Sequence, residues 1–202
     1  MAHSDPTDVA WYEREPARVA VGGPRPLSTP IEIADYRLEW PRLYEREEAR
    51  IRDALGGRAV RIEHVGSTSM PGLPAKPIVD ISLEVADSAD EAAYVPLLEA
   101  AGYTLRIREP EWFEHRGFKG TKTAVNLHVF TAGCEEVDRM LRFRDHLRHD
   151  TTDRELYART KRELAAHEWT YGQQYADAKS EVVQEILARA NASAGPRARR
   201  EM

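Results

Sequence analysis

The chain has 202 residues, of which 42% are hydrophobic and 31% charged, and its formal net charge is −5. This composition is typical of globular proteins and excludes an intrinsically disordered chain, while the acidic balance argues against a surface that tracks a nucleic-acid backbone. No apolar run approaches the roughly 20 residues of a membrane helix. The first residues lack the pattern of a secretory signal, so we expect a cytoplasmic location. Cys134 is the only cysteine, which excludes an internal disulfide and a cysteine metal cluster.

Prolines mark the two ends of the chain as irregular. Residues 1–30 contain five prolines and a Gly-Gly-Pro sequence, a density that leaves little room for regular structure. We expect a flexible N-terminal extension there. Residues 191–202 contain Gly and Pro and the basic run RARR, and we expect a disordered, solvated tail. One domain is therefore predicted over residues 31–190.

The first half of this domain is predicted as helix, strand, strand. Apolar residues at helical spacing run from Pro41 to the stop at Gly56. Alternation predicts strands over 59–65 and 77–85. The second of these strands carries its polar residues on one face: Asp80, Ser82 and Glu84.

The second half continues with one helix, three strands and a helical end. Ser88 and Glu91 form a capping-box pattern for a helix that ends at Gly102, followed by a strand over 103–108. Two strands joined by a turn at Gly117–Gly120 come next. Three helices are expected at the end, at about 135–149, 153–167 and 173–190. This order predicts an α+β fold, with a mixed β-sheet, helices packed on one face and a C-terminal helical subdomain over about 135–190.

The polar faces of strands 77–85 and 124–130 suggest a reactive surface. If the strands are neighbours, Asp80 and His128 lie on it together, and we take both as candidate catalytic residues. Asp80 and Glu84 are the candidate metal-ligating residues, because Mg²⁺ prefers oxygen ligands. Four positions separate them, roughly 13 Å along a strand, which is too long for one shared ion. The His128 imidazole suits a base, a phosphate donor or a metal ligand.

The loop before Asp80 adds groups that suit a phosphate. Gly66 lets the backbone approach a ligand, and Ser67, Thr68 and Ser69 offer hydroxyls and amides. Lys76 adds a positive charge. Gly/Ser turns between strands are also common without any ligand, so the loop alone does not decide between the two interpretations.

Cations on the predicted C-terminal helices have two interpretations. Arg144, Lys161 and Lys179 each lie one turn from a residue on the same helix face. In one interpretation they snorkel from the edge of an amphipathic helix. In the other they converge with Lys76 on a polyanionic ligand.

A few other residues have a structural and a functional interpretation. His64 lies on the apolar face of its strand and is interpreted as a core histidine, whereas Glu63 opposite it is a surface charge or reaches the cleft. Arg116 and Lys122 flank the predicted Gly117–Gly120 turn and could form a lip over the site.

Several stretches together resemble one family: PIEIADYRLEWPRLYEREEARI, IEHVGSTSMPGLPAKPIVDI, NLHVF, LRFRDHLR and YADAKSEVVQEIL. They look like the GrpB family, also called uncharacterised protein family 0157, over about residues 31–190. The long central motif beginning His-Val-Gly-Ser-Thr-Ser makes the resemblance specific.

The resemblance implies a fold similar to the DNA-polymerase-β-like nucleotidyltransferases. Gly66 and Ser67 match the phosphate-holding turn of that superfamily, and Asp80 matches its first metal-binding aspartate. Active members use carboxylates to hold two Mg²⁺ ions that bind a triphosphate. Here Ser82 stands at the second carboxylate position and His128 where a third acidic residue is sought. Neither side chain replaces an anionic oxygen for Mg²⁺, so standard two-metal chemistry is in doubt.

Two hypotheses of function follow. The first is a nucleotidyltransferase-like protein that binds a nucleotide or another phosphorylated small molecule, with divergent Mg²⁺-dependent nucleotidyl or phosphate transfer. The second is a non-catalytic nucleotide- or coenzyme A-binding accessory module, because GrpB-like domains resemble a segment fused behind some bacterial dephospho-coenzyme A kinases. A tailoring role on a small metabolite is a third hypothesis. The sequence leaves the oligomeric state, the base and the acceptor open.

Overall fold

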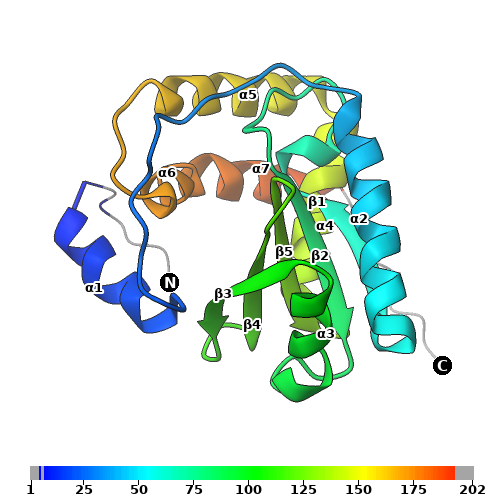
Figure 1. Cartoon of the computed structure of the whole chain (residues 1–202). Helices are drawn as coiled ribbons and strands as arrows, with labels where there is room; N and C mark the ends of the chain where they lie inside the picture. Colours follow the sequence, from blue (N-terminus) through cyan, green and yellow to red (C-terminus); the bar gives the residue numbers. More distant parts are fainter. Residues whose placement is uncertain (1–4, 6, 194–202) are drawn as a thin grey trace.

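A five-stranded mixed sheet forms the centre of the protein. The structure, a computed structural model, describes residue 5 and residues 7–193. The strands are β1 (Arg61–Val65), β2 (Val79–Val85), β3 (Tyr103–Glu109), β4 (His115–Gly120) and β5 (Val125–Thr131). Their order in the sheet is β1-β2-β5-β4-β3 (Figure 1). β2 and β5 are parallel and the other neighbours antiparallel, which confirms the predicted mixed sheet.

Helices flank this sheet and close one end of it. They are α1 (Val9–Val19), α2 (Glu39–Leu55), α3 (Val95–Ala100), α4 (Glu135–His149), α5 (Thr151–Ala165), α6 (Gly172–Asp177) and α7 (Ser180–Ser193). Figure 1 shows α2 and α3 beside the sheet and α5 across one of its ends, with α6 and α7 below α5. This arrangement confirms the predicted α+β class with a C-terminal helical part. No helix in the described part of the chain is both long and apolar enough to cross a membrane.

Apolar side chains at strand and helix spacing build the core. Ile81 and Leu127, fully buried on the alternating apolar positions of β2 and β5, pack in one cluster with Ile51 of α2 and Leu98 of α3. On the other side of the sheet, Phe130 packs in a cluster with residues of α4. Burying such a side chain contributes about 1.5–3 kcal/mol.

A separate cluster attaches the C-terminal helices to the loop before β2. It joins Met70 and Leu73 of that loop to Leu147, Tyr157 and Ile186 of α4, α5 and α7. The loop beginning at Gly66 is therefore packed against helices on one side and against the sheet on the other. This packing fixes the loop relative to β2.

The expected irregularity of residues 1–30 is wrong for part of that segment. Residues Val9–Val19 form α1, within which Pro16 lies. Tyr12 is fully buried and its hydroxyl donates to Asp177 at 2.7 Å. The chain then bridges from Ala20 to Ile107 of β3. Long-range contacts thus stabilise regular structure in a segment where the prolines disfavour it. The basic run at 197–200 lies outside the described residues.

Three other local predictions need correction. Gly117–Gly120 is part of β4 and not a turn, because Gly117 pairs with His128 in the sheet. The Ser88 hydroxyl contacts Thr131 Oγ1 at 2.9 Å and caps no helix; a short 3₁₀ turn precedes α3. The last predicted helix is divided into α6 and α7.

Candidate functional site

The site forms where parallel strands β2 and β5 begin. Asp80 lies opposite Asn126 in the β2–β5 register, and the Asn126 amide donates to Asp80 Oδ1 at 2.6 Å. Lys119 of β4 donates in turn to Asn126 Oδ1. Burial tends to raise the pKa of Asp80, but the interactions with the protonated form of His128, with Asn126 and with Lys119 outweigh it and hold the pKa below its usual range. Asp80 is therefore an ionised carboxylate, 27% exposed at its side chain.

The Gly66 turn is seated directly against this carboxylate. Gly66 has φ +67° and ψ −178°, a conformation that glycine adopts almost alone. A Cβ at this position would lie 2.8 Å from Asp80 Cβ. Gly66 is thus required both by the backbone conformation and by the contact with Asp80.

The three residues after Gly66 form a 3₁₀ turn. The Ser69 hydroxyl donates to Gly66 O at 2.6 Å, and Thr68 Oγ1 lies 3.1 Å from His64 Nε2. Ser67 interacts with the Tyr157 hydroxyl of α5. Two of the predicted phosphate-binding hydroxyls, those of Thr68 and Ser69, therefore support the turn itself, and the Ser67 hydroxyl lies between the turn and α5.

Three lysines from separate parts of the chain lie within electrostatic range of Asp80. Lys119 is connected to Asp80 through Asn126, and Lys76 and Lys179 both lie over the Tyr175 ring, 5.8 Å and 4.3 Å from its centre. Burial is the main cause that lowers the pKa of each lysine, and Asp80 is a carboxylate that raises the pKa of all three. The pKa of Lys179 falls to about 8.

Two of the predicted cations do not reach Asp80. Lys161, 2% exposed, donates to Pro74 O, and burial lowers its pKa to about 6. Arg144 donates to Glu63 at 2.9 Å and to His64 O at 3.0 Å. These side chains attach α5 and α4 to the loop and to β1. Of the cations expected to converge, the structure brings Lys76 and Lys179 together.

Sequence reasoning missed Lys119 because it placed Gly117–Gly120 in a turn. With these residues in β4, alternation puts Lys119 beside Asn126, with which it pairs in the register. Arg106 of β3 adds charge nearby, since it lowers the pKa of Lys119.

Glu84 and Ser82 do not complete a metal site. Glu84 lies at the other end of β2, where its Oε1 accepts from Gly133 N at 2.7 Å and its Oε2 lies 3.8 Å from Arg61. Ser82 is buried beside His128, with no hydrogen-bond partner for its hydroxyl among the described residues. One carboxylate among three lysines does not fit a site for two Mg²⁺ ions.

His128 connects Asp80 to a second histidine. Its Nε2 lies 3.9 Å from Asp80 Oδ1, and its Nδ1 lies 3.1 Å from His115 Nε2. His115 Nδ1 in turn lies 2.7 Å from Glu109 Oε2. The sequence analysis missed His115 and Glu109, although two-residue alternation through Gly117 would have placed His115 on the face of His128.

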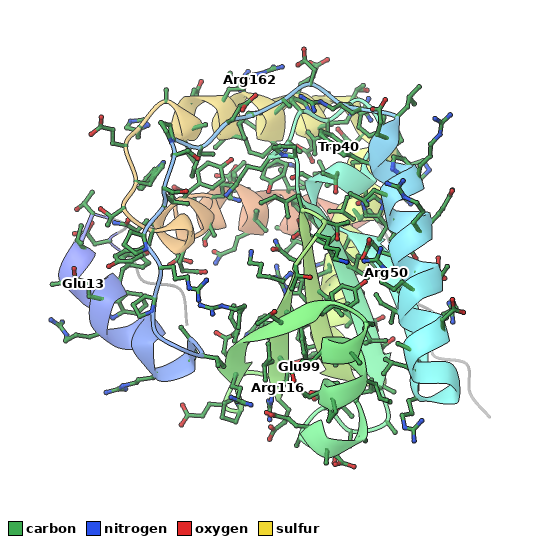
Figure 2. All side chains as sticks on the ribbon, in the orientation of Figure 1. Glu13, Trp40, Arg50, Glu99, Arg116 and Arg162 are labelled. Carbon is green, nitrogen blue, oxygen red and sulfur yellow. The ribbon has the colours of Figure 1, made fainter. Side chains whose placement is uncertain are left out.

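The remaining histidine and cation predictions concern structural contacts. His64 is buried and stacked on Tyr44 with ring centres 4.8 Å apart, and burial lowers its pKa to about 4, as expected of a core histidine. Arg116 donates to Glu91 at 2.6 Å and forms no lip over the site. Figure 2 shows Arg116 at the far end of the sheet from Arg162 of α5.

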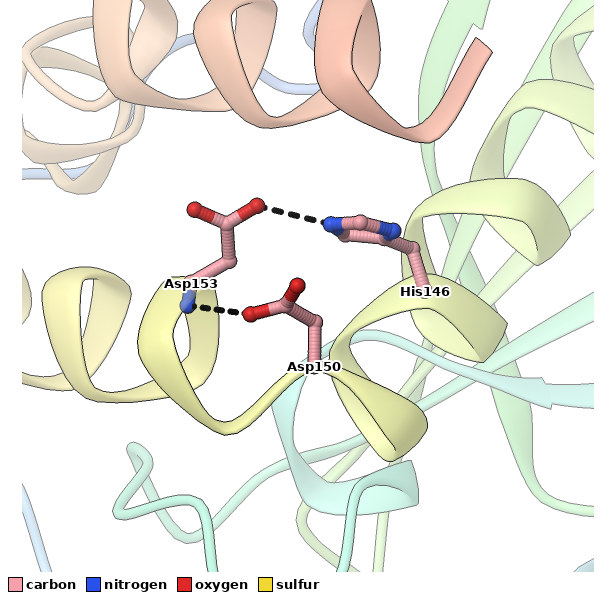
Figure 3. Close-up of side chains that lie close together, drawn as sticks. All are labelled: His146, Asp150 and Asp153. Atoms are coloured by element: carbon pink, nitrogen blue, oxygen red, sulfur yellow. Dashed lines mark hydrogen bonds and ion pairs between the residues drawn. The ribbon is translucent and has the colours of Figure 1, made fainter. Parts of the chain in front are cut away.

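A second polar cluster joins α4, α5 and α7. His146, Asp150 and Asp153 each offer an atom within 4.8 Å of the others (Figure 3). Asp153 lies 2.7 Å from His146 Nε2 and 2.8 Å from Arg189, and Asp150 Oδ1 accepts from its backbone N–H. These partners already neutralise Asp153, so the cluster is a structural connection between helices.

Comparisons with known proteins agree with the fold. The sequence model of the family described as GrpB protein matches residues 30–189. A UPF0157 protein of Halalkalibacterium halodurans is 60% identical over 181 residues, which are 90% of this chain and 93% of that protein. The crystal structure of the conserved protein GrpB from Enterococcus faecalis superposes with a TM-score of 0.69 at 25% identity, covering 81% of this chain and 99% of that one.

A partial match involves a protein with a named activity. A dephospho-CoA kinase of Mycolicibacterium paratuberculosis is 40% identical over 77 residues, which are 37% of this chain and 19% of the kinase. The match thus covers a small part of that enzyme. The family model and the full-length relative decide the assignment: the chain belongs to the GrpB protein family.

Proposed function

We propose that this protein binds a nucleotide or another phosphorylated small molecule at Asp80, with its phosphate held by Lys76, Lys119 and Lys179. The convergence of three lysines from three parts of the chain on one carboxylate carries the proposal. The three lysines and nearby Arg106 carry four positive charges, against two carboxylates, Asp80 and Asp177, which leaves an excess of two at the site. A bound phosphate would offset that excess.

Electrostatics supports an anionic ligand more than a metal. Partial burial disfavours the charged form of each lysine, as the lowered pKa values indicate. A bound anion neutralises the lysine ammonium groups. Because it also displaces water from them, the attraction between anion and ammonium is stronger than it would be in bulk water. The Gly66 turn lets the backbone approach the same ligand. Asp80 orients Asn126 and limits the net charge.

Coenzyme A and its precursor are specific candidates within this class. The partial match to a dephospho-CoA kinase supports them, because both compounds are phosphorylated adenine nucleotides. This is the accessory-module hypothesis, and it requires no chemistry at Asp80. Metal-dependent transfer remains the competing proposal, and it depends on Mg²⁺ carried in by the ligand.

Thermal unfolding with a ligand panel tests the proposal. The probes are the four nucleoside triphosphates, coenzyme A, dephospho-coenzyme A and pyrophosphate, each with EDTA or with Mg²⁺. A ligand at 100 times its Kd stabilises by about 2.7 kcal/mol, so a clear rise of Tm is expected. Stabilisation in EDTA supports the binding module. Stabilisation that requires Mg²⁺ and is lost in Asp80→Asn supports transfer chemistry instead.

Lysine variants test where the anion binds. Lys119→Met and Lys179→Met should each weaken binding at least tenfold, while Lys122→Met is the matched control, because Lys122 lies beyond the end of β4 and lines a different pocket with Arg50. Binding should also weaken above about pH 8, where Lys179 loses its proton. Equal losses in all three variants would show a general charge effect and contradict the proposed site.

A further inference from the structure

A line of hydrogen-bonding groups crosses the sheet from the site to its edge. Asp80 of β2, His128 of β5, His115 of β4 and Glu109 of β3 follow one another at 3.9, 3.1 and 2.7 Å between nearest polar atoms. Each group comes from a different strand. Neither phosphate binding by lysines nor the stability of the sheet requires two histidines in this order.

The carboxylate at the outer end sets the role of each nitrogen. Glu109, when ionised, can only accept hydrogen bonds, so His115 Nδ1 carries the hydrogen of this 2.7 Å contact. Burial is the main cause that lowers the pKa of His115, which keeps this ring neutral. A neutral ring with hydrogen on Nδ1 has a lone pair on Nε2. His115 Nε2 is therefore an acceptor.

The same assignment of donors and acceptors applies to His128. Its Nδ1 must donate to His115 Nε2 at 3.1 Å, so in the neutral ring Nε2 carries a lone pair directed toward Asp80. The 3.9 Å to Asp80 Oδ1 is too long for a hydrogen bond. Two acceptors thus lie near each other without a donor between them.

Packing holds the two rings in this arrangement. His115 and His128 are stacked with ring centres 5.3 Å apart and 21° between planes, and His115 also stacks on Phe130 at 4.9 Å. His115 is 2% exposed. The rings have little freedom to rotate, so the chain of donors and acceptors is fixed before any ligand binds.

We propose that Glu109 and His115 are positioning residues that hold His128 as its Nδ1–H tautomer, so that His128 Nε2 and Asp80 Oδ1 together receive a hydroxyl group of the ligand. Phosphate oxygens are acceptors and would be repelled by this pair, and the neighbouring lysines oppose a metal cation. A hydroxyl donor fits both constraints. The ligand is then a phosphorylated compound that also carries a free hydroxyl, such as a nucleotide or a sugar phosphate. The ligand class rests on the proposed function, whereas the tautomer does not.

Nitrogen NMR of the ligand-free full chain tests the tautomer. Histidine labelled with ¹⁵N gives signals that distinguish a protonated from an unprotonated ring nitrogen, and His128→Gln identifies the signals of His128. The measurement is made at a pH above the range in which histidines titrate. We expect a protonated Nδ1 and an unprotonated Nε2 at His128. A protonated Nε2 would overturn the proposal.

Variants separate positioning from a structural role. In Glu109→Ala the acceptor is lost, and the protonated fraction of His128 Nδ1 should fall at least twofold. His115→Phe keeps an aromatic ring for stacking but removes the acceptor, so the same change is expected. Glu111→Ala is the control, because Glu111 is an exposed carboxylate two residues away. An unchanged His128 tautomer in both variants would contradict the relay.

Two phosphorylated probes test the hydroxyl. Glycerol 3-phosphate carries phosphate and hydroxyl groups, while pyrophosphate carries phosphate alone. We expect glycerol 3-phosphate to shift His128 Nε2 and pyrophosphate to leave it in place. Equal shifts would overturn the hydroxyl assignment. If neither probe binds, the hydroxyl assignment fails, whereas the phosphate proposal is decided by the nucleotide and coenzyme A panel and the tautomer by the measurement on the free protein.

Discussion

Substitution of Gly66 by alanine tests whether close packing of the Gly66 loop against Asp80 contributes to stability. The added Cβ changes two things. It forces a side chain into a backbone conformation with φ +67° and ψ −178°, and it occupies the space of the Asp80 side chain, at 2.8 Å from Cβ and 2.9 Å from Cγ.

The structure gives a magnitude for each effect. The backbone conformation costs about 1–3 kcal/mol for a residue other than glycine. Overlap in a packed region costs about another 1–3 kcal/mol, because the loop is held by a hydrophobic cluster and cannot move away freely. We therefore expect Gly66→Ala to lower the free energy of unfolding by about 2–6 kcal/mol, which is a large part of the roughly 5–15 kcal/mol typical of a domain.

Urea denaturation followed by circular dichroism measures this loss. The matched control is Gly72→Ala in the same loop, where φ is +79° but no atom lies within 4 Å of the added Cβ. It isolates the backbone cost of about 1–2 kcal/mol. Gly66→Ala should be less stable than Gly72→Ala by at least about 1 kcal/mol.

A double variant distinguishes the contact with Asp80 from other causes. Asp80→Gly removes the atoms that the new Cβ would meet, so it should recover part of the stability of Gly66→Ala, with a coupling energy of about 1–3 kcal/mol. Strictly additive losses, together with equal stability of the two single glycine variants, would refute a contribution of this packing.

Three further outcomes concern stability. Burial lowers the pKa of Lys161 to about 6, so above pH 6 the folded state binds fewer protons than the unfolded state. The free energy of unfolding should therefore rise with pH there, by up to about 1.4 kcal/mol per pH unit. Urea denaturation of Lys161→Met at several pH values should lack this rise. For Asp153, hydrogen bonds from Arg189 and His146 outweigh burial and lower the pKa. The advantage of the wild type over Asp153→Asn should therefore be present at neutral pH and decrease progressively in acid unfolding as the pH falls below about 4. Tyr12→Phe loses the hydrogen bond to Asp177 and should cost about 1.5 kcal/mol by denaturation; no change would mean that α1 does not depend on this bond.

Periodicity was sufficient to predict strands β1, β2, β3 and β5 and the face of β2 on which Asp80 lies. Alternation along β2 and β5 defined their apolar faces, and the structure pairs Asp80 with Asn126 on the opposite face. The Gly66 loop was singled out from its own residues, and it also lies in the central motif of the family resemblance, which the comparisons confirm. The helix over 135–149 was also predicted with the bounds that α4 has.

The errors have one physical origin, which is the use of local rules where tertiary contacts decide. Glycines at 117 and 120 predict a turn when only local sequence is considered. In the structure they lie in β4, where Ile107 packs so close to Gly117 and Thr123 so close to Gly120 that a side chain would not fit without rearrangement. The prolines before residue 30 do not prevent a helix that is held by burial of Tyr12. The turn error also hid Lys119, since this residue lies in the part of β4 that was predicted as a turn.

The convergence of distant cations lies beyond any pattern in the sequence. Helix spacing predicted the same role for Lys161 and Lys179. In the structure, Lys161 is buried and donates to Pro74 O, whereas Lys179 interacts electrostatically with Asp80. What separates them is their place in the fold: Lys161 lies within α5, whereas Lys179 lies in the break between α6 and α7. The sequence pattern predicted one continuous helix there and therefore did not show this difference.

The lack of carboxylates at positions 82 and 128 argues against metal chemistry and in favour of a cationic site. A two-metal centre needs several carboxylates, and its ions then supply the positive charge that binds phosphate. Ser82 and His128 stand at the positions where the resemblance to nucleotidyltransferases leads one to expect carboxylates, while Lys119 and Lys179 supply positive charge from the protein itself. The site that we propose would therefore hold phosphate with charge on side chains instead of ions. Under that proposal a phosphorylated ligand is bound without metal, and His128 is left to contact a hydroxyl of the ligand.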